Sequence, residues 1–184
     1  MKLSPRLLPA SLLAVALAAS AVPLKADLAH SSVAAVFKQM NVPVEAQFKK
    51  FTANVDYDAA RPESAKATVD IDTASLDLGE AEMNKEVAKK EWFNAAQFPR
   101  ASFVSSSIKP AGAGRLTVTG KLSIKGKSAD VSFPLTIKAE GGKQVFEGAL
   151  PIKRLAFNIG DGEWKDTSMV ADEVLIKFRV TAAQ

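Results

Sequence analysis

Apolar residues recur at every second position in eight short runs between Val33 and Val180, and this pattern constrains the fold more than any other feature of the chain. Alternation with a period of two turns one face of each strand inward. A sheet of about eight such strands can close into a barrel, whose interior is filled by side chains or holds one small apolar ligand. We therefore expect an all-β fold, an eight-stranded antiparallel barrel.

The runs cover residues 33–37, 48–55, 65–71, 103–108, 116–124, 131–137, 146–152 and 174–180. Because proline blocks ladder pairing, the first run is expected to end before Pro43. The step from Phe48 to Phe51 is odd, and a bulge at residues 49–50 would restore the register of the second run. Between the third and fourth runs, residues 79–96 change to a helical period and predict one helical insert.

The first residues have the order of a secretory signal peptide. Basic residues come first, an apolar stretch covers residues 12–19, and small residues follow. We therefore assign residues 1–26 to the signal, with cleavage after Ala21 or Ala26. Residues 27–184 are long enough for one domain with a sizeable core and are assigned to the barrel.

The chain has no cysteine, which favours export to the bacterial periplasm over a disulfide-stabilised scaffold and excludes thiol chemistry. Removing residues 1–26 takes away three basic residues and no acidic residue, so the net charge falls from +4 to +1. The basic character of the whole chain thus belongs largely to the export signal. It gives no support for nucleic-acid binding.

Side chains suited to catalysis or metal binding are few. The only histidine, His30, stands at the start of the mature chain, and a polar residue leading into a strand is its simplest interpretation. Motifs of hydrolases, nucleotide-binding proteins and zinc enzymes are absent, so we predict neither an enzyme nor a metal site. The carboxylates within residues 161–166 could take a hard cation such as calcium, but a solvated loop fits their spacing better.

The aromatic residues are mainly phenylalanine, and many fall on inward positions. Periodicity alone leaves a packed core and a ligand-lined cavity equally open. Trp92 and Trp164 stand outside the strands and would close over a ligand if their segments cap one mouth of the barrel. Arg154 would point inside or at the rim, where its charge needs polar partners. The candidate ligand-binding residues are Phe37, Phe48, Phe51, Val55, Val69, Ile71, Trp92, Phe93, Phe103, Leu122, Phe133, Leu135, Leu150, Ile152, Arg154, Phe157 and Trp164.

Several segments resemble the YceI family of exported bacterial proteins. They are residues 30–33 (HSSV), 48–51 (FKKF), 71–76 (IDTASL), 92–103 (WFNAAQFPRASF), 118–126 (VTGKLSIKG) and 172–174 (DEV). The resemblance covers essentially the whole mature chain and implies a lipocalin-like barrel that can hold an isoprenoid chain, without established catalysis. Arg154 matches an arginine of the family, whereas Leu155 and Asn158 replace the serine and glycine around Phe157. Residues 83–87 lack the aspartate and histidine that the family commonly carries before its paired aromatics.

Two functions follow from these features. The leading hypothesis is a periplasmic carrier that sequesters an isoprenoid lipid, of the polyprenyl or quinone type, and needs no other cofactor. The alternative is a solidly packed barrel that docks a membrane redox protein through residues 79–96. Transient contact with a membrane and formation of a homodimer are left open, and no nucleic-acid partner is expected.

Overall fold

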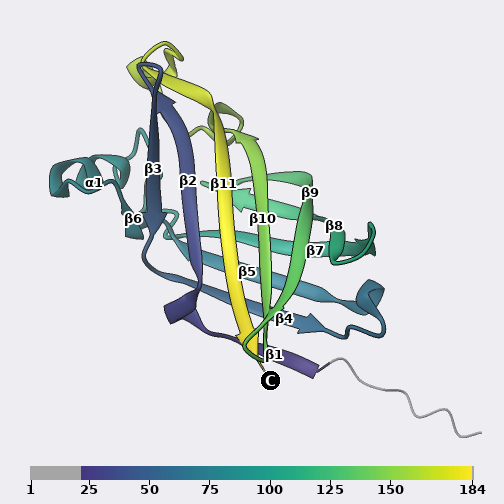
Figure 1. Cartoon of the computed structure of the whole chain (residues 1–184). Coiled ribbons are helices and arrows are strands. Elements are labelled where there is room, and N and C mark those ends of the chain that lie inside the picture. The colour runs from purple at the N-terminus through teal and green to yellow at the C-terminus, as the bar shows by residue number, and fades with distance from the viewer. Residues whose placement is uncertain (1–21, 184) are drawn as a thin grey trace, which may run out of the picture.

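The computed structural model describes residues 22–183 (Figure 1). Its strands are β1 (Val22–Ala26), β2 (Ser32–Gln39), β3 (Val42–Phe48), β4 (Phe51–Tyr57), β5 (Lys66–Asp72), β6 (Leu76–Asp77), β7 (Arg100–Pro110), β8 (Arg115–Ile124), β9 (Lys127–Glu140), β10 (Lys143–Lys153) and β11 (Val170–Ala183). All pairings are antiparallel, in the order β1-β4-β5-β7-β8-β9-β10-β11-β2-β3-β6, and a further pairing of β1 with β11 closes the sheet.

The eleven strands occupy eight positions around a closed barrel. β11 pairs with β2 over its first part and with β1 at Ala182 and Ala183, so β1 and β2 share one position. β3 and β4 share the next position, because β3 pairs with β2 and β4 pairs with β1. β5 and β6 share the third, opposite β4 and β3 respectively. The predicted eight-stranded antiparallel barrel is confirmed.

The irregularity predicted in the second run has a different form. The chain does not bulge at residues 49–50 but leaves the ladder there, which separates β3 from β4. The backbone groups freed by this break bond to the neighbouring position, where a 3₁₀ helix at Thr73–Ser75 interrupts the chain at the same level. Lys49 N–H donates to the Ser75 carbonyl at 3.0 Å, and Asp72 N–H donates to the Lys50 carbonyl at 3.0 Å. Two adjacent breaks therefore bend the wall together.

The first run ends before Pro43 as expected, because β2 stops at Gln39, but a hairpin turn and not the proline ends it. β2 and β3 form a hairpin whose two turn residues, Met40 and Asn41, have φ of 47° and 64°, the conformation of a two-residue turn that matches strand twist. Pro43 lies inside β3, opposite Lys38. It is tolerated because β3 pairs on its other side only at its last two residues, so this part of β3 is an edge.

The helical insert is shorter than predicted and differently placed. The one α-helix among residues 22–183, α1 (Ala81–Val87), follows β6 rather than the third run directly, and residues 88–99 form successive turns. Trp92 N–H and Asn94 N–H both donate to the Lys89 carbonyl, at 3.1 and 2.8 Å. No residue of α1 is fully buried, so the weak apolar stripe supports only about two turns. Within residues 22–183, no helix has the length and apolarity needed to cross a membrane.

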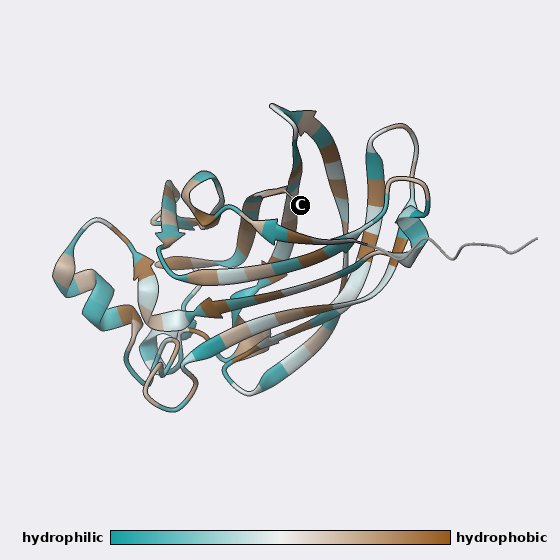
Figure 2. Cartoon of the chain, turned by 90° about the horizontal axis from the view of Figure 1, so that it is seen from below, coloured by the Kyte–Doolittle hydropathy of each residue, from teal (hydrophilic) through white to brown (hydrophobic). Residues whose placement is uncertain are grey.

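Alternation along the strands sorts side chains between the two faces of the wall. β8 shows it most cleanly, with Leu116, Val118, Leu122 and Ile124 buried and polar residues between them. Figure 2 shows the same banding of hydrophobic and hydrophilic residues along the strands. The inward side chains of all eight positions therefore face one another across the lumen.

Candidate functional site: an apolar cavity closed by a polar cap

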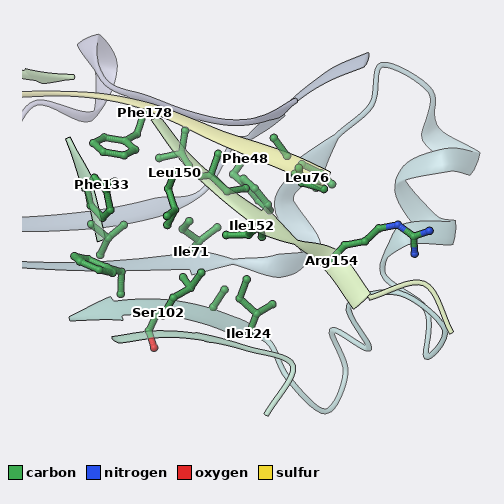
Figure 3. A pocket seen from close by; sticks show the side chains of 18 of the residues that line it. Phe48, Ile71, Leu76, Ser102, Ile124, Phe133, Leu150, Ile152, Arg154 and Phe178 are labelled. Atoms are coloured by element: carbon green, nitrogen blue, oxygen red, sulfur yellow. The ribbon is translucent and has the colours of Figure 1, made fainter. Parts of the chain in front are cut away.

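The lumen of the barrel is a cavity of about 360 Å³, within the size range of pockets for small organic ligands. Side chains from all eight strand positions line it, almost all of them aliphatic or aromatic (Figure 3). Val55, Val69, Phe103 and Phe178 face inward yet are only half-buried. A filled interior would bury these side chains, so the packed-barrel alternative is wrong on this point.

All but two of the predicted ligand-binding residues line the cavity. They are Phe37, Phe48, Val55, Val69, Ile71, Trp92, Phe93, Phe103, Leu122, Phe133, Leu135, Leu150, Ile152, Arg154 and Trp164. Phe51 instead packs, half-buried, beside the cluster that contains Phe48 and Leu76. Phe157 is 3% exposed in the main core. Both side chains are aromatic, as expected for an apolar ligand site, but they pack within the wall and the loops and do not line the lumen.

The cavity has lining residues that the candidate set omitted. Val174 and Ile176 on β11 could have been added from alternation alone, since they share the inward face with Phe178. Leu78, Met83 and Val87 come from the segment around α1, where no strand periodicity exists to indicate them. Met83 is 39% exposed, so the cavity reaches the surface beside α1.

Three aromatic rings form a row in the wall of the cavity. Phe133 lies 5.5 Å from Phe103 and 5.4 Å from Phe178, measured between ring centroids. Two inward glycines make room for this row: a Cβ on Gly120 would lie 2.5 Å from the Phe103 ring, and one on Gly148 would lie 2.4 Å from the Phe178 ring. The wall is therefore shaped by rings lying over glycine, and the remaining space is the cavity.

One end of the barrel is covered by residues 72–100, 125–126 and 154–169, which we call the cap. Within it Trp92 and Trp164 meet with centroids 5.2 Å apart and planes tilted by 50°, and both line the cavity. The two segments therefore meet at the same end of the barrel, which is the condition under which these rings would close over a ligand. The opposite end carries a smaller aromatic pair, Tyr57 and Phe146, at 5.6 Å.

Arg154 holds the cap together. It is 2% exposed, and Figure 3 shows its guanidinium directed away from the apolar side chains of the lumen. Its five N–H groups are directed at five backbone carbonyls, those of Ala171 (3.0 Å), Ile159 (2.9 Å), Gly160 (3.4 Å), Trp164 (2.7 Å) and Val170 (2.6 Å). Burial lowers the pKa of Arg154, and the charge of Asp172 opposes this shift. The expected polar partners exist, and they leave no donor free.

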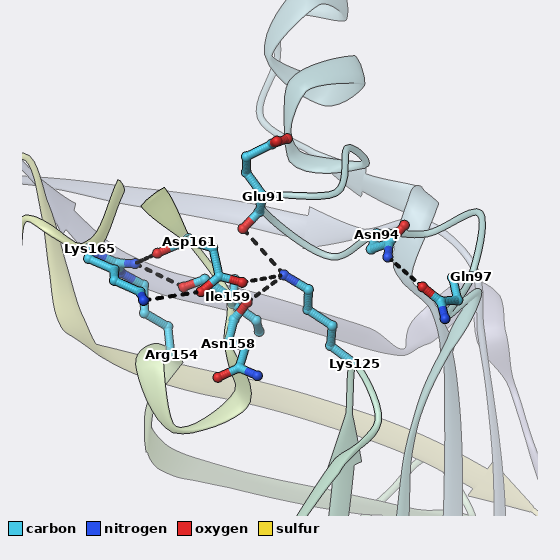
Figure 4. A network of polar contacts seen from close by, with 10 residues as sticks. Glu91, Asn94, Gln97, Lys125, Arg154, Asn158, Ile159, Asp161 and Lys165 are labelled. Carbon is cyan, nitrogen blue, oxygen red and sulfur yellow. Dashed lines mark hydrogen bonds and ion pairs between the residues drawn. The ribbon is translucent and has the colours of Figure 1, made fainter. Parts of the chain in front are cut away.

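Lys125 joins the β8–β9 hairpin to the same cap (Figure 4). Its side chain is 7% exposed, and its ammonium donates to the carbonyls of Asn158 (2.5 Å) and Glu91 (3.4 Å) and to Asp161 Oδ2 (3.3 Å). The Glu91 carbonyl also accepts from the backbone N–H of Gly160 at 2.9 Å. Three loops far apart in the sequence are thus tied at one point.

The other sequence candidates for chemistry lie apart from the cavity. Asp161 is paired with Lys125 and lies 3.9 Å from Lys165, and the Ser168 hydroxyl and N–H lower the pKa of Asp166. Across residues 22–183, no group of three His, Cys, Asp or Glu side chains is placed to hold a metal ion. His30 lies in a 3₁₀ helix before β2, with Nδ1 2.8 Å from Asp27 Oδ2.

A closed antiparallel barrel with an apolar lumen and a covered mouth is an architecture of small-ligand-binding proteins. The family model for the YceI-like domain matches residues 24–182, and the chain belongs to that family. The family resemblance of the sequence is confirmed.

Solved structures agree with the assignment. The crystal structure of BcnA from Burkholderia cenocepacia is 55% identical, covers 86% of this chain and 100% of that chain, and superposes with a TM-score of 0.84. A YceI protein from Campylobacter jejuni is 25% identical over 77% of this chain and 85% of that one, with a TM-score of 0.68. A polyisoprenoid-binding domain from Saccharophagus degradans shares the fold at 15% identity, with a TM-score of 0.68 over 89% of this chain and 98% of that one.

Curated relatives match over a shorter stretch. A UPF0312 protein from Pseudomonas putida is 38% identical over 98 residues, which is 53% of this chain and 51% of the relative. A UPF0312 protein from Pseudomonas fluorescens matches to the same extent. The chain thus spans about half the length of the curated relatives it matches.

Proposed function

We propose that this protein is a periplasmic carrier that encloses an isoprenoid lipid, of the polyprenyl or quinone type, in its barrel. The observation that carries the proposal is the cavity of about 360 Å³ with an almost wholly apolar lining. Each methylene group buried in such a lumen contributes about 0.8 kcal/mol of affinity. The polyisoprenoid-binding domain from Saccharophagus degradans, which shares the fold, supports this class of ligand.

Docking of a membrane redox protein through residues 79–96 stays a separate prediction. It no longer needs a packed barrel, and α1 offers exposed charged side chains such as Glu82 and Lys85, which pair with each other at 2.7 Å. The carrier proposal is favoured because it uses the cavity, and docking does not.

A matched pair of substitutions tests where the ligand binds. Val69 on β5 lines the cavity, and Val104 on the neighbouring strand β7 is 52% exposed on the outer face. We expect Val69→Phe to weaken binding of a C15 isoprenoid alcohol about tenfold, because the added ring displaces about two methylene groups. Val104→Phe should leave binding unchanged. Equal effects in a calorimetric titration, or no uptake by the unchanged protein, would sink the proposal.

Residues 1–21 of the predicted signal peptide lie outside the described residues, and we propose that cleavage follows Ala21. β1 begins at Val22 and pairs with both β4 and β11. Cleavage after Ala26 would remove this strand, which closes the barrel. The mass of the protein recovered from the periplasm separates the two sites. A mature chain that begins at Asp27 would contradict both the chosen site and the role of β1.

Exposed apolar side chains at the cavity rim suggest where the lipid is taken up. Gln39 and Val170 line the cavity and face each other across β2 and β11. The next residues outward, Met40 and Met169, are 61% and 45% exposed, and Met40 N–H donates to the Met169 carbonyl at 2.9 Å. We propose that this methionine pair touches the bilayer during transfer.

The rim is tested by the rate of transfer from vesicles. Replacing Met40 and Met169 together by serine should slow uptake of a vesicle-borne isoprenoid several-fold, since less apolar surface meets the bilayer, while the affinity for ligand stays the same. Val104→Ser, on the outer wall, serves as the control. An unchanged rate in the double variant would remove the rim from the pathway.

A further inference from the structure

Among the buried side-chain nitrogen and oxygen atoms of residues 22–183, one has no hydrogen-bond partner, and it belongs to the cavity wall. This atom is Nε1 of Trp92. Buried donors in folded proteins are nearly always paired, so a lone exception calls for an explanation. Trp92 lines the cavity at the cap, where a bound molecule is the natural source of an acceptor.

The neighbours of Trp92 do not supply that acceptor. Arg154, whose guanidinium carbon lies 5.8 Å from the centre of the indole ring, has only donors to offer. The carbonyls of Ile159, Trp164 and Val170 in the same cap accept from Arg154, and none of them accepts from Nε1. Arg154 therefore lies against the indole without giving Nε1 an acceptor.

The cap also offers little to a charged head group. Among the described lining residues, the charged side chains are Glu86 and Arg154. Glu86 is paired with Lys89 at 2.5 Å, and all five donors of Arg154 are used within the cap. A phosphate head would need cationic donors of its own, and the lining does not provide them.

We propose that Trp92 Nε1–H donates a hydrogen bond to a neutral oxygen, a hydroxyl or a carbonyl, at the head of the bound lipid. This inference rests on the proposed function and adds the chemistry and orientation of the ligand. The head lies at the cap, and the tail runs past the Phe133 row toward Tyr57 and Phe146.

Three C15 probes separate the contributions of tail and head: farnesene (a hydrocarbon), farnesol (an alcohol) and farnesyl diphosphate. We expect farnesol to bind about fivefold more tightly than farnesene, the gain of one neutral hydrogen bond. Trp92→Phe should remove this preference and leave farnesene binding unchanged. Trp164→Phe, which removes the other indole, should keep it. Farnesyl diphosphate should bind no more tightly than farnesol.

Nuclear magnetic resonance gives a readout that packing alone would not move. The chain has two tryptophans, so its spectrum holds two indole N–H signals, and Trp164→Phe assigns them. Farnesol should shift the Trp92 signal downfield, as hydrogen bonding requires, and farnesene should not. Thermal melting of each variant confirms folding.

Several outcomes would overturn the inference. Equal loss of farnesol and farnesene affinity in Trp92→Phe would make the indole a packing element only. Diphosphate binding more than about tenfold tighter than farnesol would contradict the neutral head. Failure of farnesene itself to bind would count against the carrier function instead, and the inference would fall with it.

Discussion

The wall of the barrel and its cap are held by different interactions. The wall consists of strands in register, with apolar side chains inside and rings lying over glycine at Gly120 and Gly148. Apart from the two-residue strand β6 and the strand ends at Asp72 and Arg100, the cap has no sheet. It is fixed by two buried cations, Arg154 and Lys125, that donate mainly to backbone carbonyls. The wall can adjust because it borders the cavity, whereas the backbone of the cap is held in place by the carbonyls that Arg154 and Lys125 bind.

The difference also divides the function. The wall supplies apolar surface in amounts set by the strand pattern, and it carries most of the affinity proposed here. The cap holds Trp92 and Trp164 against each other at one end of the lumen. In such a barrel the wall would discriminate between lipids of different chain length, and the cap would discriminate between lipids with different head groups.

Arg154→Met gives the largest expected effect. The substitution keeps an unbranched stem as far as the position of Nε but leaves five backbone carbonyls without their donor, at a cost of about 3–5 kcal/mol in the free energy of unfolding. The free energy of unfolding of Arg154→Lys should lie between those of the unchanged protein and Arg154→Met, because lysine keeps the positive charge but lacks the planar guanidinium. Urea denaturation measures both variants.

The two tryptophans make this test specific to the cap. Both lie in the cap and neither in a strand, so their fluorescence follows the cap while far-ultraviolet circular dichroism follows the wall. In Arg154→Met the fluorescence transition should occur at lower urea than the dichroism transition. Coincident transitions would show that the wall and the cap unfold as one unit, and the distinction drawn above would fail.

Glycine substitutions compare the two regions directly. A Cβ on Gly160 would lie 2.1 Å from the Arg154 guanidinium, and φ there is +84°. A Cβ on Gly148 would lie 2.4 Å from the far end of the Phe178 ring, which can move into the lumen. We expect Gly160→Ala to cost about 2–4 kcal/mol and Gly148→Ala about 1 kcal/mol or less. Gly162→Ala, with φ of +66° and nothing within 4 Å, gives the backbone cost alone.

Thermal melts of the three variants decide this comparison. If Gly160→Ala is no worse than Gly162→Ala, the cap has room to shift and the rigidity assigned to Arg154 is wrong. Gly148→Ala carries a second expectation, since pushing Phe178 inward shrinks the cavity. In this variant we expect the loss of binding free energy for the lipid to exceed the loss of free energy of unfolding.

The difference between the wall and the cap also explains which features could be predicted from the sequence. Alternation identified the eight strand positions and most of the lining, because inward Phe133 and Ile152 follow directly from a period of two. It failed at residues 49–50, where a break in one strand depends on a break in its neighbour at Thr73–Ser75. No local pattern encodes that match.

The cap was predictable only in outline. The need of Arg154 for polar partners could be inferred from the cost of burying its charge. The identity of those partners could not, because they are backbone carbonyls spread over residues 159–171, and carbonyls carry no sequence signal. The unpaired Nε1 of Trp92 is likewise invisible until the neighbours of the ring are known.

The smallest expected effect concerns the far end of the wall, which is held by exposed ion pairs instead of buried ones. Asp27 Oδ2 accepts from Lys143 Nζ at 2.7 Å and lies 2.8 Å from His30 Nδ1, and these hydrogen bonds, that of Lys143 first, lower the pKa of Asp27 from 3.8 to about 2. A carboxyl group whose pKa is lowered by folding stabilises the fold above its ordinary pKa and loses that contribution as pH falls from about 4 through 2. The urea midpoint should therefore drop over this range, and Asp27→Asn should flatten the drop. Because the pair is exposed, 1 M salt should flatten it as well. A wild-type slope that survives both changes would assign the acid sensitivity to another carboxylate and leave the Asp27 cluster without a role in stability.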